Sequence, residues 1–181
     1  MKFEESALPG LLVITPRKFG DSRGYFLETY NQRLMNDAGL PAVWVQDNSS
    51  LSKKNVLRGI HYQVTQPQGK LVRVSQGAVL DVAVDLRRSS PAYGKYEAVE
   101  LSAENGKMLW IPPGFGHAFL VLSDVAGFAY KVTDYYSQAG ERTIVWNDPD
   151  LAIPWPITAD EAIVSEKDRA GARFKDADVF A

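Results

Sequence analysis

Cysteine is absent from this chain of 181 residues. The absence excludes a disulfide framework, a thiolate nucleophile, and zinc or iron–sulfur sites held by cysteine. Histidine is scarce as well, because only His61 and His117 occur. A metal site built from three histidines of one chain is therefore also excluded.

A surplus of one charge and a long apolar run are missing too. Twenty Lys and Arg residues face 22 Asp and Glu residues, which gives a formal net charge of −2. Bulk electrostatics gives no case for nucleic-acid or membrane binding, so any anion site must be local. No apolar run approaches the ~20 residues that span a bilayer, and Met1–Gly10 lacks the apolar core of a signal peptide. We expect a soluble cytoplasmic protein without nucleic-acid or membrane partners.

The chain does contain enough apolar residues for a sizeable core. They make up 45% of the sequence, and aromatic residues make up 11%, which argues against overall disorder. No repeat, low-complexity tract or linker-like stretch divides the sequence. We expect one domain over residues 1–181.

Short apolar runs separated by glycines and other turn residues dominate the pattern. In Asp81–Leu86, larger apolar side chains alternate with acidic or small ones, which is typical of a half-buried strand. The other clear runs are Leu71–Val74, Met108–Ile111, Phe119–Leu122 and Phe128–Val132. Many short strands favour an all-β sandwich or barrel.

Helical signals are few. Asn31–Ala38 is expected to form two turns, with Asn31 as the N-cap and Gly39 just past the end. Thr158–Glu161 and Ser165–Asp168 have capping-box spacing. We therefore expect one or two short helical turns near the C-terminus.

His61 lies in the strand-like segment Val56–Gln63, three residues after Arg58. Side chains alternate along a regular strand, so Arg58 and His61 would point to opposite faces. A glycine inside a strand often marks a bulge, and a bulge at Gly59 would turn both side chains toward one cavity. The residues alone leave two interpretations open: a bulged strand that carries a site, or an ordinary strand with an exposed arginine and a hydrogen-bonded core histidine.

Two further segments carry polar side chains in a comparable way. Phe26 and Glu28 share a strand face while Arg23 is out of phase, and Gln46 shares a face with Asn48. Arginines and amides that converge on a cavity suit a ligand with phosphates, because a guanidinium binds phosphate oxygens through two donors. The alternative is a set of surface ion pairs, such as Arg23 with Glu28.

Several candidates for chemistry also have an ordinary structural explanation. Lysine at the start of a strand, as at Lys70, is usually a solvated charge, and a strand tyrosine such as Tyr130 usually packs with its hydroxyl at the rim. His117 opens a strand after a tight turn, and Asp168 completes a capping box. No G-x-G-x-x-G after a strand, Walker-type motif or G-x-S-x-G elbow occurs, so the best markers of nicotinamide, P-loop and α/β-hydrolase enzymes are missing.

Taken in order, the polar segments resemble those of a known family. The matching segments are Asp21–Glu28, Gln46–Asn48, Val56–Gln63, Gly69–Arg73, Leu109–Phe119, Tyr130–Tyr136, and Asp148–Asp150 with Ser165–Asp168. This set resembles the dTDP-4-dehydrorhamnose 3,5-epimerase family from about residue 10 to residue 170. One such segment is a weak signal, but seven in order are specific.

The resemblance implies a cupin-type β-jelly roll (a double-stranded β-helix) with a few short peripheral helices. It implies a homodimer that uses no metal or other cofactor. It also implies a dTDP-linked 4-keto-6-deoxyhexose as substrate: dTDP-4-dehydro-6-deoxy-D-glucose, inverted at C3 and C5 to give dTDP-4-dehydro-L-rhamnose. The C4 ketone acidifies the C3 and C5 protons, and the enolate that follows carries its charge mainly on O4.

The resemblance also implies roles for individual residues. It makes His61 the catalytic base, Asp168 the carboxylate that orients it, Tyr130 the general acid and Lys70 the contact to the C4 oxygen. It implies that Tyr136 stacks on thymine. The other ligand-contacting positions that it implies are Arg23, Phe26, Glu28, Gln46, Asn48, Arg58, His117, Glu141 and Lys167.

Three other functions remain compatible with the sequence. One is an epimerase that inverts only C3 or only C5, with the same base and acid. Another is a 3,4-ketoisomerase acting on the same nucleotide sugar, which would move the ketone from C4 to C3. The third is a sugar-binding cupin without catalytic activity.

Overall fold

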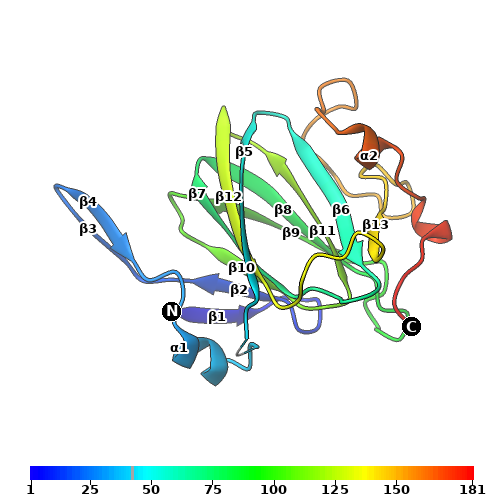
Figure 1. The fold of residues 1–181 in the computed structure, drawn as a ribbon. Helices are drawn as coiled ribbons and strands as arrows, with labels where there is room; N and C mark the ends of the chain where they lie inside the picture. The colour runs from blue at the N-terminus through cyan, green and yellow to red at the C-terminus, as the bar shows by residue number, and fades with distance from the viewer. Residues whose placement is uncertain (42) are drawn as a thin grey trace.

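Two antiparallel β-sheets face each other and form the body of the molecule (Figure 1). The computed structural model describes residues 1–41 and 43–181. Over these residues, the strands of the larger sheet follow the order β1 (Lys2–Glu5), β2 (Leu12–Thr15), β10 (Met108–Ile111), β7 (Lys70–Gln76), β12 (Val125–Val132) and β5 (Gln46–Lys53). The strands of the smaller sheet follow the order β13 (Glu141–Thr143), β6 (Leu57–Gln63), β11 (Phe115–Val121), β8 (Ala78–Asp85) and β9 (Tyr96–Ser102). The structure confirms the expected all-β jelly roll.

Alternation along the strands decides which side chains the sheets enclose. Along β5, the side chains from Gln46 to Ser52 at every second position are at least partly buried, and those between them are exposed. Along β8, Val79 and Ala83 join the core between the sheets, whereas Val82 joins a second cluster on the outer face. The period of two seen in the sequence therefore corresponds to two different faces of each sheet.

Aromatic side chains fill the core between the sheets. Phe119 of β11 stacks on Phe128 of β12, with the ring centroids 4.3 Å apart. The ring of His117 stacks on Phe128 in turn, at 5.8 Å. The apolar core thus ends against an imidazole, and polar groups occupy the space beyond it.

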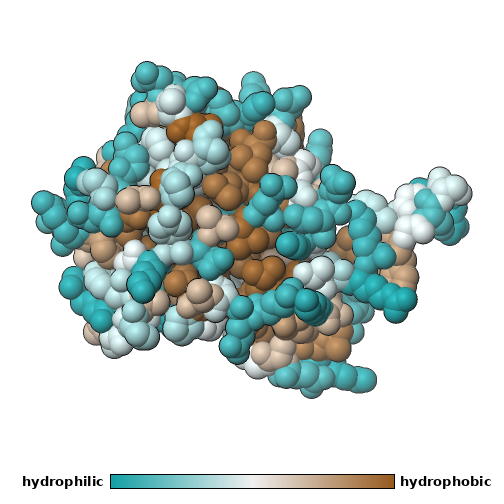
Figure 2. Space-filling model, turned by 180° about the vertical axis from the view of Figure 1, so that it is seen from behind, coloured by the Kyte–Doolittle hydropathy of each residue, from teal (hydrophilic) through white to brown (hydrophobic). Residues whose placement is uncertain are grey.

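The C-terminal segment covers the outer face of the smaller sheet. Ile144 and Leu151 of this segment share a buried cluster with Val82 of the sheet, and Trp146 shares another with Leu120. The buried carboxylate of Asp148 accepts hydrogen bonds from the backbone of Leu151 and Phe174 and so ties two parts of the segment together. Seen from behind, apolar side chains gather in the middle of the molecule and hydrophilic ones surround them (Figure 2).

The helices agree with two of the three sequence signals. The helix α1 (Gln32–Asp37) begins after Asn31, whose side chain accepts from two backbone N–H groups. The helix α2 (Glu166–Arg169) begins after Ser165, whose hydroxyl accepts from the backbone of Asp168, and a 3₁₀ turn, η1 (Phe174–Asp176), follows it. In Thr158–Glu161 the carboxylate of Glu161 accepts from the backbone N–H of Thr158, but the segment forms only a turn. With α2 and η1, the structure confirms the expected one or two short helical turns near the C-terminus. Among the described residues, no helix is long and apolar enough to cross a membrane.

A hairpin projects from the body of the sandwich. It consists of β3 (Lys18–Asp21) and β4 (Gly24–Leu27), and Figure 1 shows it reaching away from the side that carries β6 and α2. The apolar side chains of Phe19, Tyr25 and Phe26 are exposed on it.

A bulge in β6 sets the direction of the side chains of Arg58 and His61. Arg58 lies opposite Phe119 of β11 and His61 lies opposite His117, so three steps along β6 match two steps along β11. The extra residue turns Arg58 and His61 to the same face, which confirms the bulge that Gly59 predicted. Gly59 has φ +119°, and a Cβ there would lie 2.5 Å from the carbonyl oxygen of His117.

We expect the substitution Gly59→Ala to destabilise the fold by about 1–3 kcal/mol, because an extra carbon must displace the neighbouring strand. Urea unfolding of the purified protein measures this. Gly20→Ala is the matched control, since a Cβ at Gly20 meets its nearest neighbour at an ordinary 3.7 Å. Equal unfolding midpoints for the two variants would contradict the account of the bulge.

Candidate active site

The imidazole of His61 is paired with a buried carboxylate. Its Nε2 lies 2.5 Å from Oδ1 of Asp168, which α2 holds against β6. Oδ2 of the same carboxylate accepts from the backbone N–H of Gly59. Burial alone would raise the pKa of Asp168, but the hydrogen bonds from His61 and the backbone outweigh it and leave that pKa below its ordinary value. Because the carboxylate is ionised and can only accept, Nε2 carries the proton and Nδ1 is left free to act as a base.

A second histidine–carboxylate pair lies beside the first. His117 stands opposite His61 in the neighbouring strand, and its Nε2 lies 2.9 Å from Oδ2 of Asp81 on β8. Burial lowers the pKa of His117, although Asp81 opposes the shift. This imidazole is therefore neutral near pH 7.

Lys70, the first residue of β7, brings a positive charge into the same interior. Burial lowers its pKa to about 8, and the carboxylates of Asp81 and Glu141 oppose the shift. A lysine with this pKa is still mostly protonated at neutral pH. The larger sheet thus supplies a cation that faces the two imidazoles of the smaller sheet.

Tyr130 of β12 lies on the inner face of the larger sheet, next to the apolar core. Burial raises the pKa of its phenol, and the positive charge of Arg58 opposes the shift. The guanidinium of Arg58 donates to the hydroxyl of Ser52 at 3.1 Å. Further along β5, Gln46 donates to Asn48 at 2.8 Å, so the amides also lie on the inner face.

Three predicted ligand-contacting residues, Tyr136, Glu141 and Lys167, form a connected group close to β6. The hydroxyl of Tyr136 donates to Oε2 of Glu141 at 2.9 Å, and the ammonium of Lys167 lies 2.5 Å from the other oxygen. Glu141 belongs to β13, which pairs with β6 beside His61. Burial would raise the pKa of Glu141, but the hydrogen bonds from Lys167 and Tyr136 outweigh it and lower that pKa.

Three other predicted contacts lie elsewhere in the chain. Arg23 and Phe26 are exposed on the projecting hairpin, and Glu28 follows it. Arg23 is paired with Asp21 of its own turn at 2.6 Å, not with Glu28. The structure therefore does not bring these three residues together with His61 within the chain.

Asp81 was not singled out by the sequence analysis, although the structure places it beside His117. The only sequence signal was an acidic residue at an alternate position of an apolar strand. That pattern equally predicts an exposed aspartate on the polar face of a half-buried strand. The difference depends on which face the opposite sheet covers.

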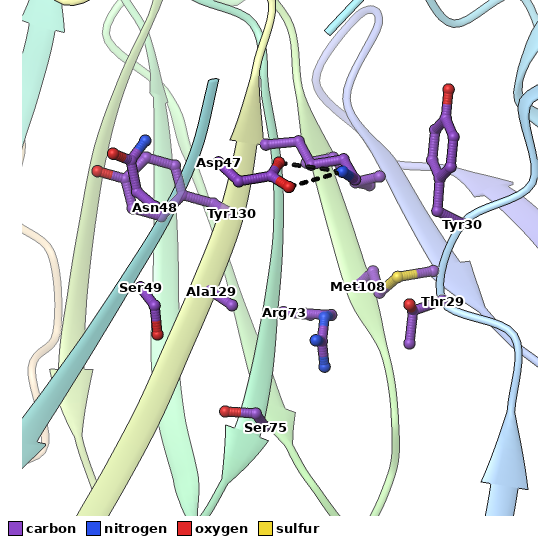
Figure 3. A pocket seen from close by; sticks show the side chains of 12 residues that line it. Thr29, Tyr30, Asp47, Asn48, Ser49, Arg73, Ser75, Met108, Ala129 and Tyr130 are labelled. Carbon is purple, nitrogen blue, oxygen red and sulfur yellow. Dashed lines mark hydrogen bonds and ion pairs between the residues drawn. The ribbon is translucent and has the colours of Figure 1, made fainter. Parts of the chain in front are cut away.

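A hollow of about 470 Å³ lies on the outer face of the larger sheet, lined by residues that include Arg73, Met108 and Asp47. Figure 3 shows the side chains of Asn48 and Tyr130 together on one side of β12 and those of Arg73 and Met108 on the other. Asn48 and Tyr130 also line the hollow, but their side chains point to the other side of β12 (Figure 3).

The titratable side chains pair with one another rather than gather as metal ligands. In the part of the chain that the structure describes, no three His, Asp or Glu side chains lie close enough to hold a metal ion. Each imidazole is engaged by one carboxylate instead. This arrangement suits proton transfer at carbon, with a base, a nearby cation and a phenol.

Comparisons with known proteins agree with this geometry. The profile of the dTDP-4-dehydrorhamnose 3,5-epimerase family matches residues 5–176. A Pseudomonas aeruginosa protein of that name is 54% identical over 99% of both chains, and one from Shigella flexneri is 49% identical over 99% of both. A solved Legionella pneumophila dTDP-6-deoxy-D-glucose-3,5-epimerase, in complex with dTDP-4-keto-L-rhamnose, is 46% identical with a TM-score of 0.93, covering 98% of this chain and 94% of that one. The chain therefore belongs to the dTDP-4-dehydrorhamnose 3,5-epimerase family.

Proposed function

We propose that this protein inverts C3 and C5 of dTDP-4-dehydro-6-deoxy-D-glucose to give dTDP-4-dehydro-L-rhamnose, with His61 as the base and Tyr130 as the acid. The observation that carries the proposal is that His61 and Tyr130 belong to two sheets that face each other. His61 comes from the smaller sheet and Tyr130 from the larger sheet that faces it. A sugar ring bound between the sheets would meet a base on one side and an acid on the other, which is what inversion requires.

The first step is removal of a proton from the carbon next to the ketone. Nδ1 of His61 takes the proton, and the ionised Asp168 stabilises the imidazolium that forms. A positioned base of this kind contributes on the order of 10²- to 10⁴-fold. The electron pair moves to O4, so the step needs no redox cofactor.

In this scheme Lys70 stabilises the enolate. Burial lowers its pKa to about 8, so the lysine is mostly protonated at neutral pH, before charge develops on O4. A single preorganised donor is typically worth about 10²- to 10³-fold in rate. Because Lys70 must be protonated for this role, activity is expected to fall as the pH rises through its pKa of about 8.

Tyr130 returns a proton on the opposite side of the ring. Burial raises the pKa of its phenol, so the hydroxyl still carries its proton at neutral pH. Proton return from that side inverts the centre, whereas return from His61 restores the starting configuration.

The residues around the proposed site supply groups suited to the nucleotide end of the substrate. The diphosphate carries about two negative charges, so local cations such as Arg58 and Lys167 are needed on a protein with a net charge of −2. Tyr136 is held by Glu141 and offers an exposed ring on which thymine can stack. Gln46, Asn48 and His117 offer hydrogen-bonding groups from the inner faces.

We propose that the protein works as a homodimer in which the hairpin of one copy reaches the cavity of the other. This would bring Arg23, Phe26 and Glu28 to a substrate that they cannot reach in their own protomer. The exposed aromatic rings of the hairpin, with 69% of Phe26 accessible, support the proposal, since large exposed apolar groups close together commonly mark an interface. The cytoplasmic location stays a prediction.

The substitution His61→Ala is expected to abolish turnover while dTDP still binds, because the base is lost and the nucleotide contacts remain. The reaction is run in deuterium oxide and read by NMR. In the unsubstituted protein, deuterium at both C3 and C5 supports the double inversion. Label at one carbon only would indicate a single epimerase, a ketone at C3 would indicate a ketoisomerase, and no label would indicate a binding protein. Near-normal turnover of the variant would refute the role of His61.

Tyr130→Phe tests the acid separately. The variant keeps His61, so we expect substrate C–H bonds still to exchange with solvent deuterium while inversion falls at least about 10²-fold. Comparing exchange with the yield of inverted sugar measures both steps. Loss of both in parallel would show that Tyr130 has no separate role as the acid.

Phe26→Asp tests the homodimer. A charge at the centre of the hairpin interface should shift the sedimenting mass from dimer to monomer and lower turnover with it. Ile163→Asp is the control, because Ile163 is similarly exposed but lies away from the hairpin. A Phe26→Asp protein that remains dimeric would exclude the hairpin as the contact.

A further inference from the structure

We propose that Asp81 is a positioning residue for this reaction, because its buried carboxylate both orients His117 and holds the positive charge of Lys70 beside the substrate. The inference rests on the proposed function, since it concerns the same cavity. It assigns a role to a residue that touches neither the reacting carbons nor the nucleotide in the scheme above.

Asp81 is a carboxylate buried in apolar surroundings. Its side chain is completely inaccessible, and the neighbouring inward positions of β8, Val79 and Ala83, belong to the apolar core. An ionised carboxylate without a partner in such a place costs several kcal/mol. A carboxylate at this position therefore depends on the positive or hydrogen-bond-donating groups around it.

One of its two oxygens sets the state of His117. Oδ2 of Asp81 lies 2.9 Å from Nε2 of His117, and burial keeps that imidazole neutral by lowering its pKa. Nε2 therefore carries the single ring proton and donates it to Asp81. Nδ1 of His117 is left as an acceptor, suited to a sugar hydroxyl rather than to a phosphate oxygen.

The other oxygen of Asp81 is available to Lys70. Oδ1 of Asp81 is buried and has no hydrogen-bond partner among the described residues. Across the interior stands Lys70, whose ammonium likewise has no hydrogen bond or ion pair in the described part of the chain. The carboxylate of Asp81 therefore has an oxygen free to act on Lys70, and Asp81, followed by Glu141, opposes the burial that lowers the pKa of this lysine.

Other titratable or charged groups face the same interior, and their partners decide which of them matters for Lys70. They are His61 and Arg58 of β6, His117 of β11, Tyr130 of β12, Glu141 of β13 and Asp168 of α2. Glu141 is already paired with Lys167 at the rim, and Asp168 is paired with His61. Asp81 remains as the carboxylate with an oxygen free to act on Lys70, in the least solvated position.

The direction of the expected pH shift follows from the role of Lys70, which requires its protonated form. Removing the charge of Asp81 lowers the pKa of Lys70 further, so activity should be lost at a lower pH than in the unsubstituted protein. His117 is neutral already, so its protonation does not change. Asp81→Asn removes the charge and still offers an oxygen to Nε2 of His117, so it separates the two roles of Asp81.

The experiment measures kcat/KM from pH 6 to pH 10. For Asp81→Asn we expect the alkaline limb of the pH profile, where kcat/KM falls as the pH rises, to shift to lower pH by about one unit. At a given pH on this limb kcat/KM would be about tenfold lower than in the unsubstituted protein, and most of the difference would disappear at pH 6. Asp81→Glu keeps the charge and should keep the limb close to its original pH. Asp85→Asn is the matched control, because Asp85 lies on the same strand, is equally buried and pairs with Arg87. It should lower stability without moving the limb.

A direct titration separates this inference from the proposed function. In protein labelled with ¹³C at lysine Cε, the NMR signal that Lys70→Arg removes reports the charge of Lys70 without any turnover. We expect that signal to titrate near pH 8, and about one unit lower in Asp81→Asn. An unmoved limb and signal in Asp81→Asn would overturn the inference, as would a Lys70 that titrates below pH 7 in the unsubstituted protein. Failure of the proposed function would appear separately, as absence of deuterium uptake by the unsubstituted protein.

Discussion

Charged groups survive inside this β-sandwich because almost every one has a counter-charge or a donor on a neighbouring element. His61 has Asp168, His117 has Asp81, and Glu141 has Lys167. Removal of a charge from water costs several kcal/mol, and a paired charge recovers that cost only at close range. The partners come from strands and a helix far apart in sequence, so the candidate site and the fold depend on the same long-range contacts.

Strand register gives these groups their direction. The extra residue in β6 puts Arg58 and His61 on one face, and it places His61 opposite His117. The two sheets supply different groups, because the imidazoles come from the smaller sheet, whereas the ammonium of Lys70 and the phenol of Tyr130 come from the larger one. Two packed sheets hold these groups on facing elements, as the proposed base and acid require, whereas a flexible loop would have to be ordered first.

Local charge and net charge are separate properties here. The chain is nearly neutral, yet cations converge on the interior and its rim. Lys167 is held by Glu141 before any ligand binds, and Tyr136 is held by the same carboxylate. The hairpin departs from this pattern, since Arg23 is paired only with Asp21 of its own turn. Its distance from the cavity is what leads us to propose a second copy.

The sequence by itself determined the features that local chemistry controls. Alternation in Asp81–Leu86 predicted a strand, Asn31 and Ser165 predicted caps, and Gly59 predicted a bulge, because each depends on neighbours a few residues away. The residues alone left His61 between a core and a catalytic role, and its assignment as the base came from a resemblance across seven segments. Only the tertiary structure decided that Asp81 faces inward, that Arg23 lies far from His61 and that Thr158–Glu161 stays a turn. Those outcomes depend on which face a second sheet covers and on contacts between distant segments, and no local pattern contains that information.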